Sequence, residues 1–188
     1  MHWKQLPYVA VAFVLALLGA VAVAARQSDE GSAAAPAAAD ARLKVAHLAP
    51  FGADEDGTSV SIRIDGSDVL TEVVFADVSG YLPLPAGVYE VTVVPTGAST
   101  PAITQSVTLE AGKDYTAAAV GDGANQSLEL LALEDDNAPL ADNAKLRIVH
   151  AAPFAADLND TRVDVRFQDG TPVAGLSDIP FKAIGPIS

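Results

Sequence analysis

The fold class of this chain follows from one stretch, Val60-Ser-Ile-Arg-Ile-Asp-Gly-Ser-Asp-Val-Leu-Thr-Glu-Val-Val-Phe75. Val60, Ile62 and Ile64 alternate with polar residues, which is the two-residue period of a strand that is buried on one side. The Asp65-Gly66 pair that follows is typical of a tight turn, and residues 69–75 continue as a second strand. The pattern therefore predicts a β-hairpin.

The same kind of pattern continues downstream of the hairpin. Apolar stretches at residues 88–94, 103–109, 115–120 and 128–133 are separated by Gly- and Pro-containing turns. No segment after residue 42 has a sustained helical period. About seven short strands in ~95 residues predict an all-β domain, namely an immunoglobulin-like antiparallel β-sandwich. A small β-barrel is the alternative fold.

An internal repeat divides the chain. Residues 41–51, ARLKVAHLAPF, reappear as residues 144–154, AKLRIVHAAPF, at an offset of 103 residues. Over residues 41–64 the two copies share 11 identities in 24 positions. The sequence therefore predicts a tandem array, with a first β-sandwich domain at 41–137, a linker at 138–143 and a truncated second copy at 144–188. We expect the second copy to be loosely structured or to pair with another chain, because its sheets are incomplete.

The N-terminal segment predicts export. Residues 6–25 carry no charge, follow Lys4, and end in the small residues Ala22-Val-Ala24 that signal peptidase accepts. A retained transmembrane helix is the alternative, because about 20 apolar residues just span a bilayer. We therefore predict a signal peptide or membrane anchor helix at 1–25 and an Ala/Pro/Ser-rich linker at 26–40. The rest of the chain is then secreted or held in the cell envelope.

Composition excludes several classes of partner and chemistry. The chain has 11 Lys and Arg against 24 Asp and Glu, which gives a formal net charge of −13. Phosphate binding relies on clustered basic residues, so we expect no nucleic-acid partner. We expect membrane contact only through the N-terminal segment, if that segment is uncleaved. The absence of Cys excludes disulfides, thiolate nucleophiles and cysteine zinc sites.

Several stretches of the first copy are similar to a known family. They are Val78–Val94 (VSGYLPLPAGVYEVTVV), Thr108–Thr116 (TLEAGKDYT), Leu133–Asn137 (LEDDN) and the His-x-x-Pro start at His47. As a set they resemble the exported bacterial domain of unknown function 4397 (DUF4397), over the whole first copy and the start of the second. The resemblance implies an exported domain that often occurs in tandem copies, and it assigns no catalytic residues.

His47 and His150 are equivalent in the two copies, and each lies shortly before a proline, Pro50 or Pro153. An imidazole can bind a metal ion or act as a base. Recurrence in both copies favours a structural role instead, in which a buried ring bonds to nearby backbone and fixes the corner between strand and loop. We therefore predict a structural role for all four residues.

Asp54, Asp56, Asp157 and Asn159 are candidate metal ligands in the loops after these corners. Oxygen ligands at alternating loop positions suit Ca²⁺, but the loops lack the central Gly and closing Glu of a helix-loop-helix calcium site. A solvated acidic loop is the preferred interpretation. The run Glu134–Asp136 is interpreted in the same way, as a charged exit into the linker. No nucleophile or phosphate-binding motif is present, so we predict no catalytic site and no cofactor.

These observations favour a non-catalytic exported β-sandwich module of the bacterial cell envelope, with a binding, adhesive or structural role. A protein or a carbohydrate at the cell surface is the expected partner. The alternative is an exported protein that binds Ca²⁺ or a small ligand through the Asp54–Asp56 loop and its repeat. An exported hydrolase accessory ranks last.

Overall fold

The computed structural model describes residues 39–187, which form ten strands and one short 3₁₀-helix. The strands are β1 (Ala41–His47), β2 (Val60–Ile64), β3 (Ser67–Val73), β4 (Leu82–Leu84), β5 (Gly87–Pro95), β6 (Ile103–Leu109), β7 (Asp114–Val120), β8 (Glu129–Asp135), β9 (Leu146–Val149) and β10 (Ile184–Ile187), and the 3₁₀-helix is η1 (Asp56–Thr58). The all-β prediction is confirmed for this part of the chain. The predicted signal or anchor segment lies outside the described residues, and within 39–187 no helix is long and apolar enough to cross a membrane.

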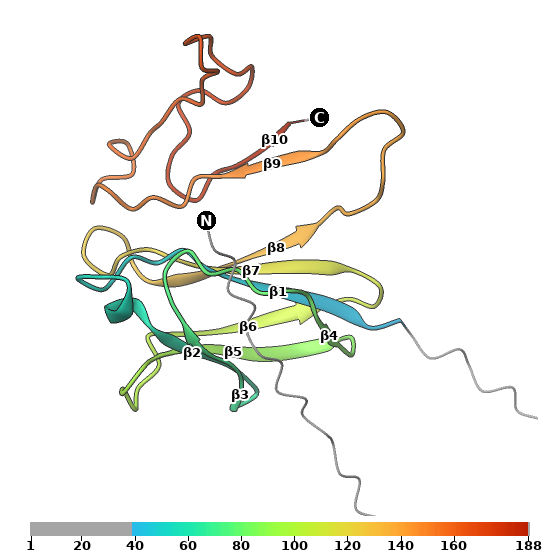
Figure 1. The fold of residues 1–188 in the computed structure, drawn as a ribbon, viewed down its shortest axis with the longest axis vertical. Helices are drawn as coiled ribbons and strands as arrows, with labels where there is room; N and C mark the ends of the chain where they lie inside the picture. The colour runs from blue at the N-terminus through green and yellow to red at the C-terminus, as the bar shows by residue number, and fades with distance from the viewer. Residues whose placement is uncertain (1–38, 188) are drawn as a thin grey trace, which may run out of the picture.

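Strands β1 to β8 form two facing four-stranded sheets (Figure 1). One sheet has the order β4-β1-β7-β8 and the other has the order β3-β2-β5-β6. Strand pairs are antiparallel with one exception, because β1 and β7 run parallel from Arg42 opposite Asp114 to His47 opposite Ala119. The expectation of purely antiparallel sheets is therefore corrected. Between β1 and β7 the chain enters the other sheet twice, through β2 and β3 and then through β5 and β6, and β4 lies between these two excursions.

The predicted hairpin is formed by β2 and β3. Both turn residues have positive φ, 49° at Asp65 and 79° at Gly66, which matches the right-handed twist of the two strands. The Asp65 carboxylate also accepts a hydrogen bond of 2.9 Å from the backbone N–H of Glu90 on β5. The turn is thereby fastened to the next strand of its sheet.

The core lies between the two sheets and is built from alternate residues of nearly every strand. Its largest fully buried members are Leu43, Val60, Ile62, Val91, Val93 and Leu109. Strand β7 contributes the small residues Ala117 and Ala119 to this core, while Ala118 and Val120 point to the other side of the sheet. That outer side is buried as well, so β7 is covered on both faces.

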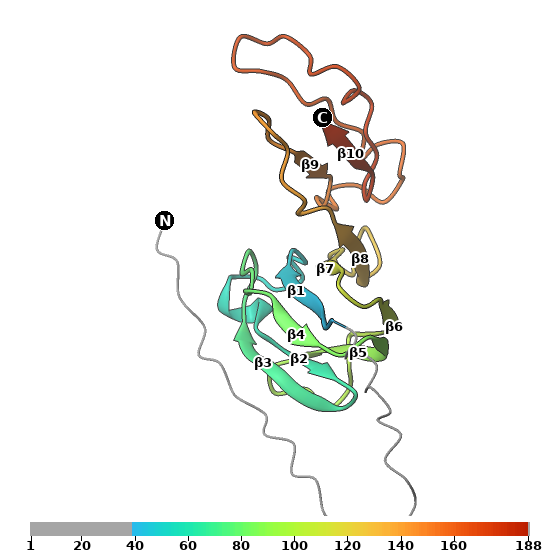
Figure 2. The ribbon, with the colours of Figure 1, turned by 90° about the vertical axis from the view of Figure 1, so that its right-hand side faces the viewer.

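Residues 144–187, hereafter the C-terminal segment, cover the outer face of the sheet that contains β1 and β7. Phe181 packs on Ala46, Ala118 and Val120, and the Lys182 ammonium lies 2.6 Å from a carboxylate oxygen of Glu129. Figure 2 shows the segment as a separate layer beyond β8, with β9 and β10 paired to each other. The expectation that the second copy is loosely structured or pairs with another chain stays a prediction. In the structure, Phe181 of this segment packs on the outer face of the first copy.

The repeat offers a matched pair of leucines for a stability test. Leu43 is 1% exposed in the core, whereas its repeat equivalent Leu146 is 55% exposed on β9. We predict that Leu43→Ala lowers the free energy of unfolding by about 2–5 kcal/mol, the usual cost of emptying a core site. Leu146→Ala should change it by less than about 0.5 kcal/mol. Chemical denaturation in dilute solution measures both, and equal losses would contradict the difference in burial.

Candidate functional site

The side chain of His47 is fully buried at the end of β1. Its Nε2 lies 2.8 Å from the carbonyl oxygen of Thr58, so this nitrogen carries the proton and donates. The backbone N–H of Ala49 donates to Nδ1 at 3.4 Å. The Phe51 ring stacks at a centroid distance of 5.7 Å. Both ring nitrogens are therefore used inside the protein, and neither is free to bind a metal ion.

Thr58 completes this corner. Its hydroxyl donates to the carbonyl of Glu55 at 2.5 Å and accepts from the backbone N–H of Phe75 at 2.8 Å. The backbone N–H of Ala76 in turn donates to the carbonyl of His47 at 2.8 Å. One histidine and one threonine thus tie together the end of β1, η1 and the chain just after β3.

The C-terminal segment repeats this corner contact for contact. His150 Nε2 donates to the Thr161 carbonyl at 2.7 Å, and Ala152 N–H donates to Nδ1 at 3.4 Å. The Thr161 hydroxyl accepts from the N–H of Phe181 at 2.9 Å. The corner prolines differ, since Pro50 is exposed and Pro153 is buried. The structural role of the two histidines and the two prolines stays a prediction. The contacts show which backbone groups the two histidine rings would hold in place.

The candidate metal ligands are engaged in local turns. The Asp54 carboxylate accepts from the N–H of Gly57 at 2.8 Å, and the Asp157 carboxylate accepts from the N–H of Asn159 at 2.8 Å. Asp56 opens η1. Among residues 39–187 no three His, Asp or Glu side chains are grouped so that they could hold a metal ion. The structure does not bring these four residues together as one site.

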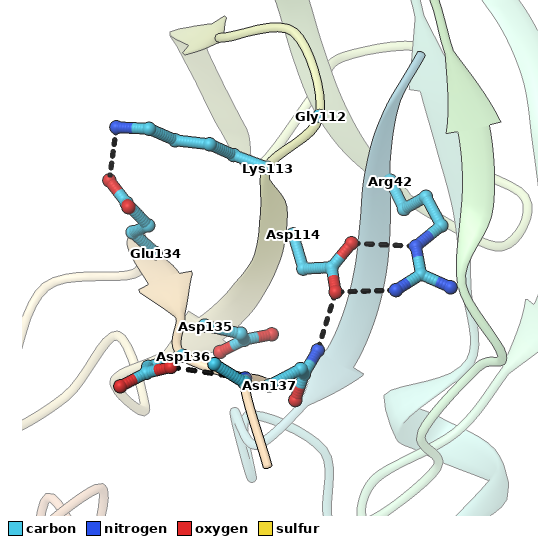
Figure 3. A pocket seen from close by; sticks show the side chains of 9 residues that line it. Arg42, Gly112, Lys113, Asp114, Glu134, Asp135, Asp136 and Asn137 are labelled. Carbon is cyan, nitrogen blue, oxygen red and sulfur yellow. Dashed lines mark hydrogen bonds and ion pairs between the residues drawn. The ribbon is translucent and has the colours of Figure 1, made fainter. Parts of the chain in front are cut away.

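A polar cluster lies instead where β1, β7 and β8 meet the C-terminal segment. We call it the Asp135 cluster, and its members are Arg42, Tyr81, Asp114, Thr116, Asp135, Asn137 and Arg147. Part of it lines a cavity of 370 Å³ (Figure 3). The run Glu134–Asp136 was predicted only as a charged exit into the linker. The LEDDN stretch was the available signal for this cluster, but its partners are far away in sequence.

Asp135 is the centre of the cluster. Its Oδ2 accepts from the hydroxyls of Tyr81 at 2.7 Å and Thr116 at 2.6 Å. Its Oδ1 accepts from the guanidinium of Arg147 at 2.7 Å. A second nitrogen of the same guanidinium donates to the carbonyl of Glu134. This carboxylate therefore links two strands of the first copy to β9 of the C-terminal segment.

Asp114 forms the other half of the cluster. Arg42 binds it through two nitrogens at 2.6 Å each, and the amide nitrogen of Asn137 donates to it at 2.6 Å (Figure 3). The hydrogen bonds from Arg42 and then from Asn137 hold the pKa of the Asp114 carboxyl below its ordinary value. Lys145 lowers the pKa of Asp136 in the same way, through an ion pair of 2.6 Å.

The chemistry of the Asp135 cluster follows from these contacts. Asp114 and Asp136 are held in their charged forms, so neither is tuned to serve as a general acid near neutral pH. Each of the acids at positions 114, 134, 135 and 136 faces a basic side chain of the protein itself. The arrangement is suited to holding strand ends and the C-terminal segment in place.

We predict that His47→Ala lowers the free energy of unfolding by about 1–3 kcal/mol at neutral pH, because it leaves the Thr58 carbonyl without its buried donor. Thermal and chemical denaturation measure the loss. A variant that unfolds like the wild type but has lost a bound metal ion would contradict the structural role.

The same substitution should change the pH dependence of stability. Burial lowers the pKa of His47 from its ordinary value of 6.5, partly offset by the hydrogen bond to Thr58. The unfolded chain then binds the proton more tightly than the folded one. The stability from this ring is fully present above about pH 6.5 and is lost as the pH falls toward the lower folded pKa. The variant should lose less stability than the wild type over this range.

Comparison with known proteins gives one match. The family model of the domain of unknown function DUF4397 matches residues 51–161, more than half of the chain. The comparisons with curated proteins and with solved structures found no match. The matched span begins at Phe51, whose ring stacks on His47, and ends at Thr161, the acceptor of the His150 corner, so it crosses the predicted boundary between the copies. The chain therefore belongs to the DUF4397 family.

Proposed function

We propose that this chain is a non-catalytic, exported β-sandwich module of the bacterial cell envelope, immunoglobulin-like in architecture, with a structural role. In this role the first copy and the C-terminal segment act as one rigid body that spaces or displays what is attached to it. The observation that carries the proposal is the Asp135 cluster, which joins the two parts through a partly buried ion pair.

The joint between the parts supports rigidity. Asp135 is 12% exposed and Arg147 30% exposed at the side chain, so solvent screens this pair less than a surface ion pair. Lys145 and Lys182 add ion pairs of 2.6 Å to Asp136 and Glu129, on either side of it. Phe181 adds an apolar contact beside the Lys182–Glu129 pair, with the Lys182 ammonium 5.7 Å from the centre of its ring. Several separate contacts oppose hinge motion better than one.

The chemistry of the polar groups also supports a structural role. Within residues 39–187, every buried side-chain nitrogen or oxygen has a hydrogen-bond partner inside the protein. A catalytic or ligand site typically keeps polar groups directed at an empty position. The cavity beside Asp114 is lined instead by side chains that bind one another. This favours a structural role over a ligand site at this cavity.

We predict that Arg147→Ala uncouples the two parts. Losing the guanidinium leaves the Asp135 carboxylate with one unmet charge and costs about 1–3 kcal/mol. Limited proteolysis should then cut within residues 138–143 and leave a stable core that ends near Asn137, whereas the wild type resists at the same protease dose.

The matched control is Arg166→Ala. Arg166 pairs with Asp164 at 2.8 Å on the exposed surface of the C-terminal segment, and its side chain donates hydrogen bonds to Asp164 and Gly170 of that segment. This variant should be cleaved like the wild type. A linker that is equally resistant in Arg147→Ala and in the wild type would contradict the proposal that the ion pair between Asp135 and Arg147 carries the joint.

The exported location has its own test. We predict that the mature N-terminus lies between residues 23 and 41, because Ala22-Val-Ala24 fits the cleavage pattern. N-terminal sequencing of the protein from the producing cell measures it. Recovery of Met1 on membrane-bound protein would show a retained anchor instead of a cleaved signal.

A further inference from the structure

The chain after β3 extends the equivalence of the two copies. Phe75 and Phe181 each donate a backbone hydrogen bond to the hydroxyl of the corner threonine in their own copy, at 2.8 and 2.9 Å. The next residues, Ala76 and Lys182, both have positive φ, 71° and 67°, and both donate to the carbonyl of the corner histidine. Phe181 and Lys182 are therefore the structural equivalents of Phe75 and Ala76.

Strand β9, the repeat equivalent of β1, lies against β8 and runs antiparallel to it (Figure 1). Arg147 on β9 pairs with Asp135 at the end of β8 at 2.7 Å. Lys182, whose N–H bonds to the carbonyl of the residue after β9, pairs with Glu129 at the start of β8 at 2.6 Å. Because β8 is antiparallel to β7 and β7 is parallel to β1, β9 runs in the same direction as β1.

The outer faces of the two copies therefore meet about an approximate two-fold axis that is parallel to the strands and passes over β7. This axis exchanges β1 with β9, places β9 opposite β8, and keeps the strand direction. Phe181 packs on Ala118 and Val120 of β7, the strand over which the axis passes. A two-fold contact is isologous, so it uses the same surface on both sides. The contact between the copies thus indicates that the outer face of the first copy is complementary to itself.

Lys44 supplies the basic half of this contact in the first copy. It is equivalent to Arg147, and it points to the outer face because its neighbours Leu43 and Val45 are in the core. Its ammonium takes part in none of the ion pairs that residues 39–187 form. Lys44 can therefore offer a second molecule the positive charge that Arg147 offers to Asp135.

Phe75 supplies the apolar half of the contact. Its equivalent Phe181 is 4% exposed, because it packs on an apolar seat, whereas Phe75 is 40% exposed. The apolar seat is formed by Ala46, Ala118 and Val120 of the first copy. The seat and a ring that fits it are thus both present on the outer side of the first copy. These matched groups select a second copy of this chain, rather than an unrelated protein, as the occupant of the surface.

We propose that the outer face of the first copy is a self-association surface, which the C-terminal segment occupies within the same molecule. When that segment is displaced, the outer face of a second chain takes its place. Lys44 of each chain then pairs with Asp135 of the other, and Phe75 of each chain packs on the apolar seat of the other. The segment thus keeps the chain monomeric. This inference rests on the joint of the proposed function and adds the partner that the uncovered joint accepts.

The test compares the full chain with a double variant, Arg147→Glu with Phe181→Asp. The new carboxylates lie beside Asp135 and Glu129, so like charges repel the segment from the outer face. Sedimentation velocity over a range of concentrations measures association, and limited proteolysis of residues 138–143 measures whether the segment has come away. We expect the wild type to be monomeric and uncleaved. The double variant should be cleaved at the same protease dose, and in the intact state it should dimerise as its concentration rises.

The two readouts separate this inference from the proposed function. A cleaved double variant that stays monomeric at every concentration would overturn the self-association surface and leave the joint as proposed. A double variant that is neither cleaved nor dimeric would overturn both, because Arg147 and Phe181 would then not be the groups that hold the segment on the surface.

Two further substitutions, each made in the double variant, test the symmetry of the contact. Lys44→Glu places a negative charge opposite Asp135 of the other chain, and it does so twice in each dimer, while Phe75→Asp removes the ring twice. Each should form roughly tenfold less dimer or lower still. Val88→Asp is the matched control, because Val88 is 67% exposed on β5 of the other sheet, and it should leave the dimer unchanged. A dimer that persists in both test variants, or is lost equally in Val88→Asp, would contradict the assignment of the surface.

Discussion

The hydrogen bond from the His47 ring to the Thr58 carbonyl is the contact on which the architecture of the first copy depends. It is fully buried, and it joins the end of β1 in one sheet to the residue that leads into β2 in the other sheet. A buried carbonyl without a donor is costly, so the ring holds the sheets at a fixed separation at this end. The hydroxyl of Thr58 then sets where the chain goes after β3.

The chain contains two copies of this corner, and the copies differ in what packs around them. Phe75 and Phe181 are held by equivalent threonine hydroxyls, yet Phe75 is exposed while Phe181 is buried on the outer face of the first copy. The corner therefore fixes the backbone regardless of what covers the aromatic ring. Both copies keep the same hydrogen bonds at the corner. Whether an apolar side chain beside the corner is buried depends on which other segments pack against it.

Local sequence predicted those parts of the fold that depend on neighbours along the chain. The alternation at residues 60–64 and the Asp65-Gly66 turn gave the β2-β3 hairpin, because strand period and positive φ are local properties. The parallel pairing of β1 with β7 could not be predicted, since it joins residues about seventy positions apart and has no local signature. The short strand β4 was missed because three residues are too few for a period to show.

The same distinction explains why the Asp135 cluster was not predicted. An acidic run and an isolated arginine each suggest a solvated surface, because a sequence does not show which opposite charge lies beside which. In the fold, the run at the end of β8 lies next to Arg147 and Lys145 of the C-terminal segment. The acidic run is therefore engaged by basic side chains of the same chain. The C-terminal segment has no net charge, so the attraction between the two parts comes from local ion pairs, in which Lys145, Arg147 and Lys182 face carboxylates of the first copy.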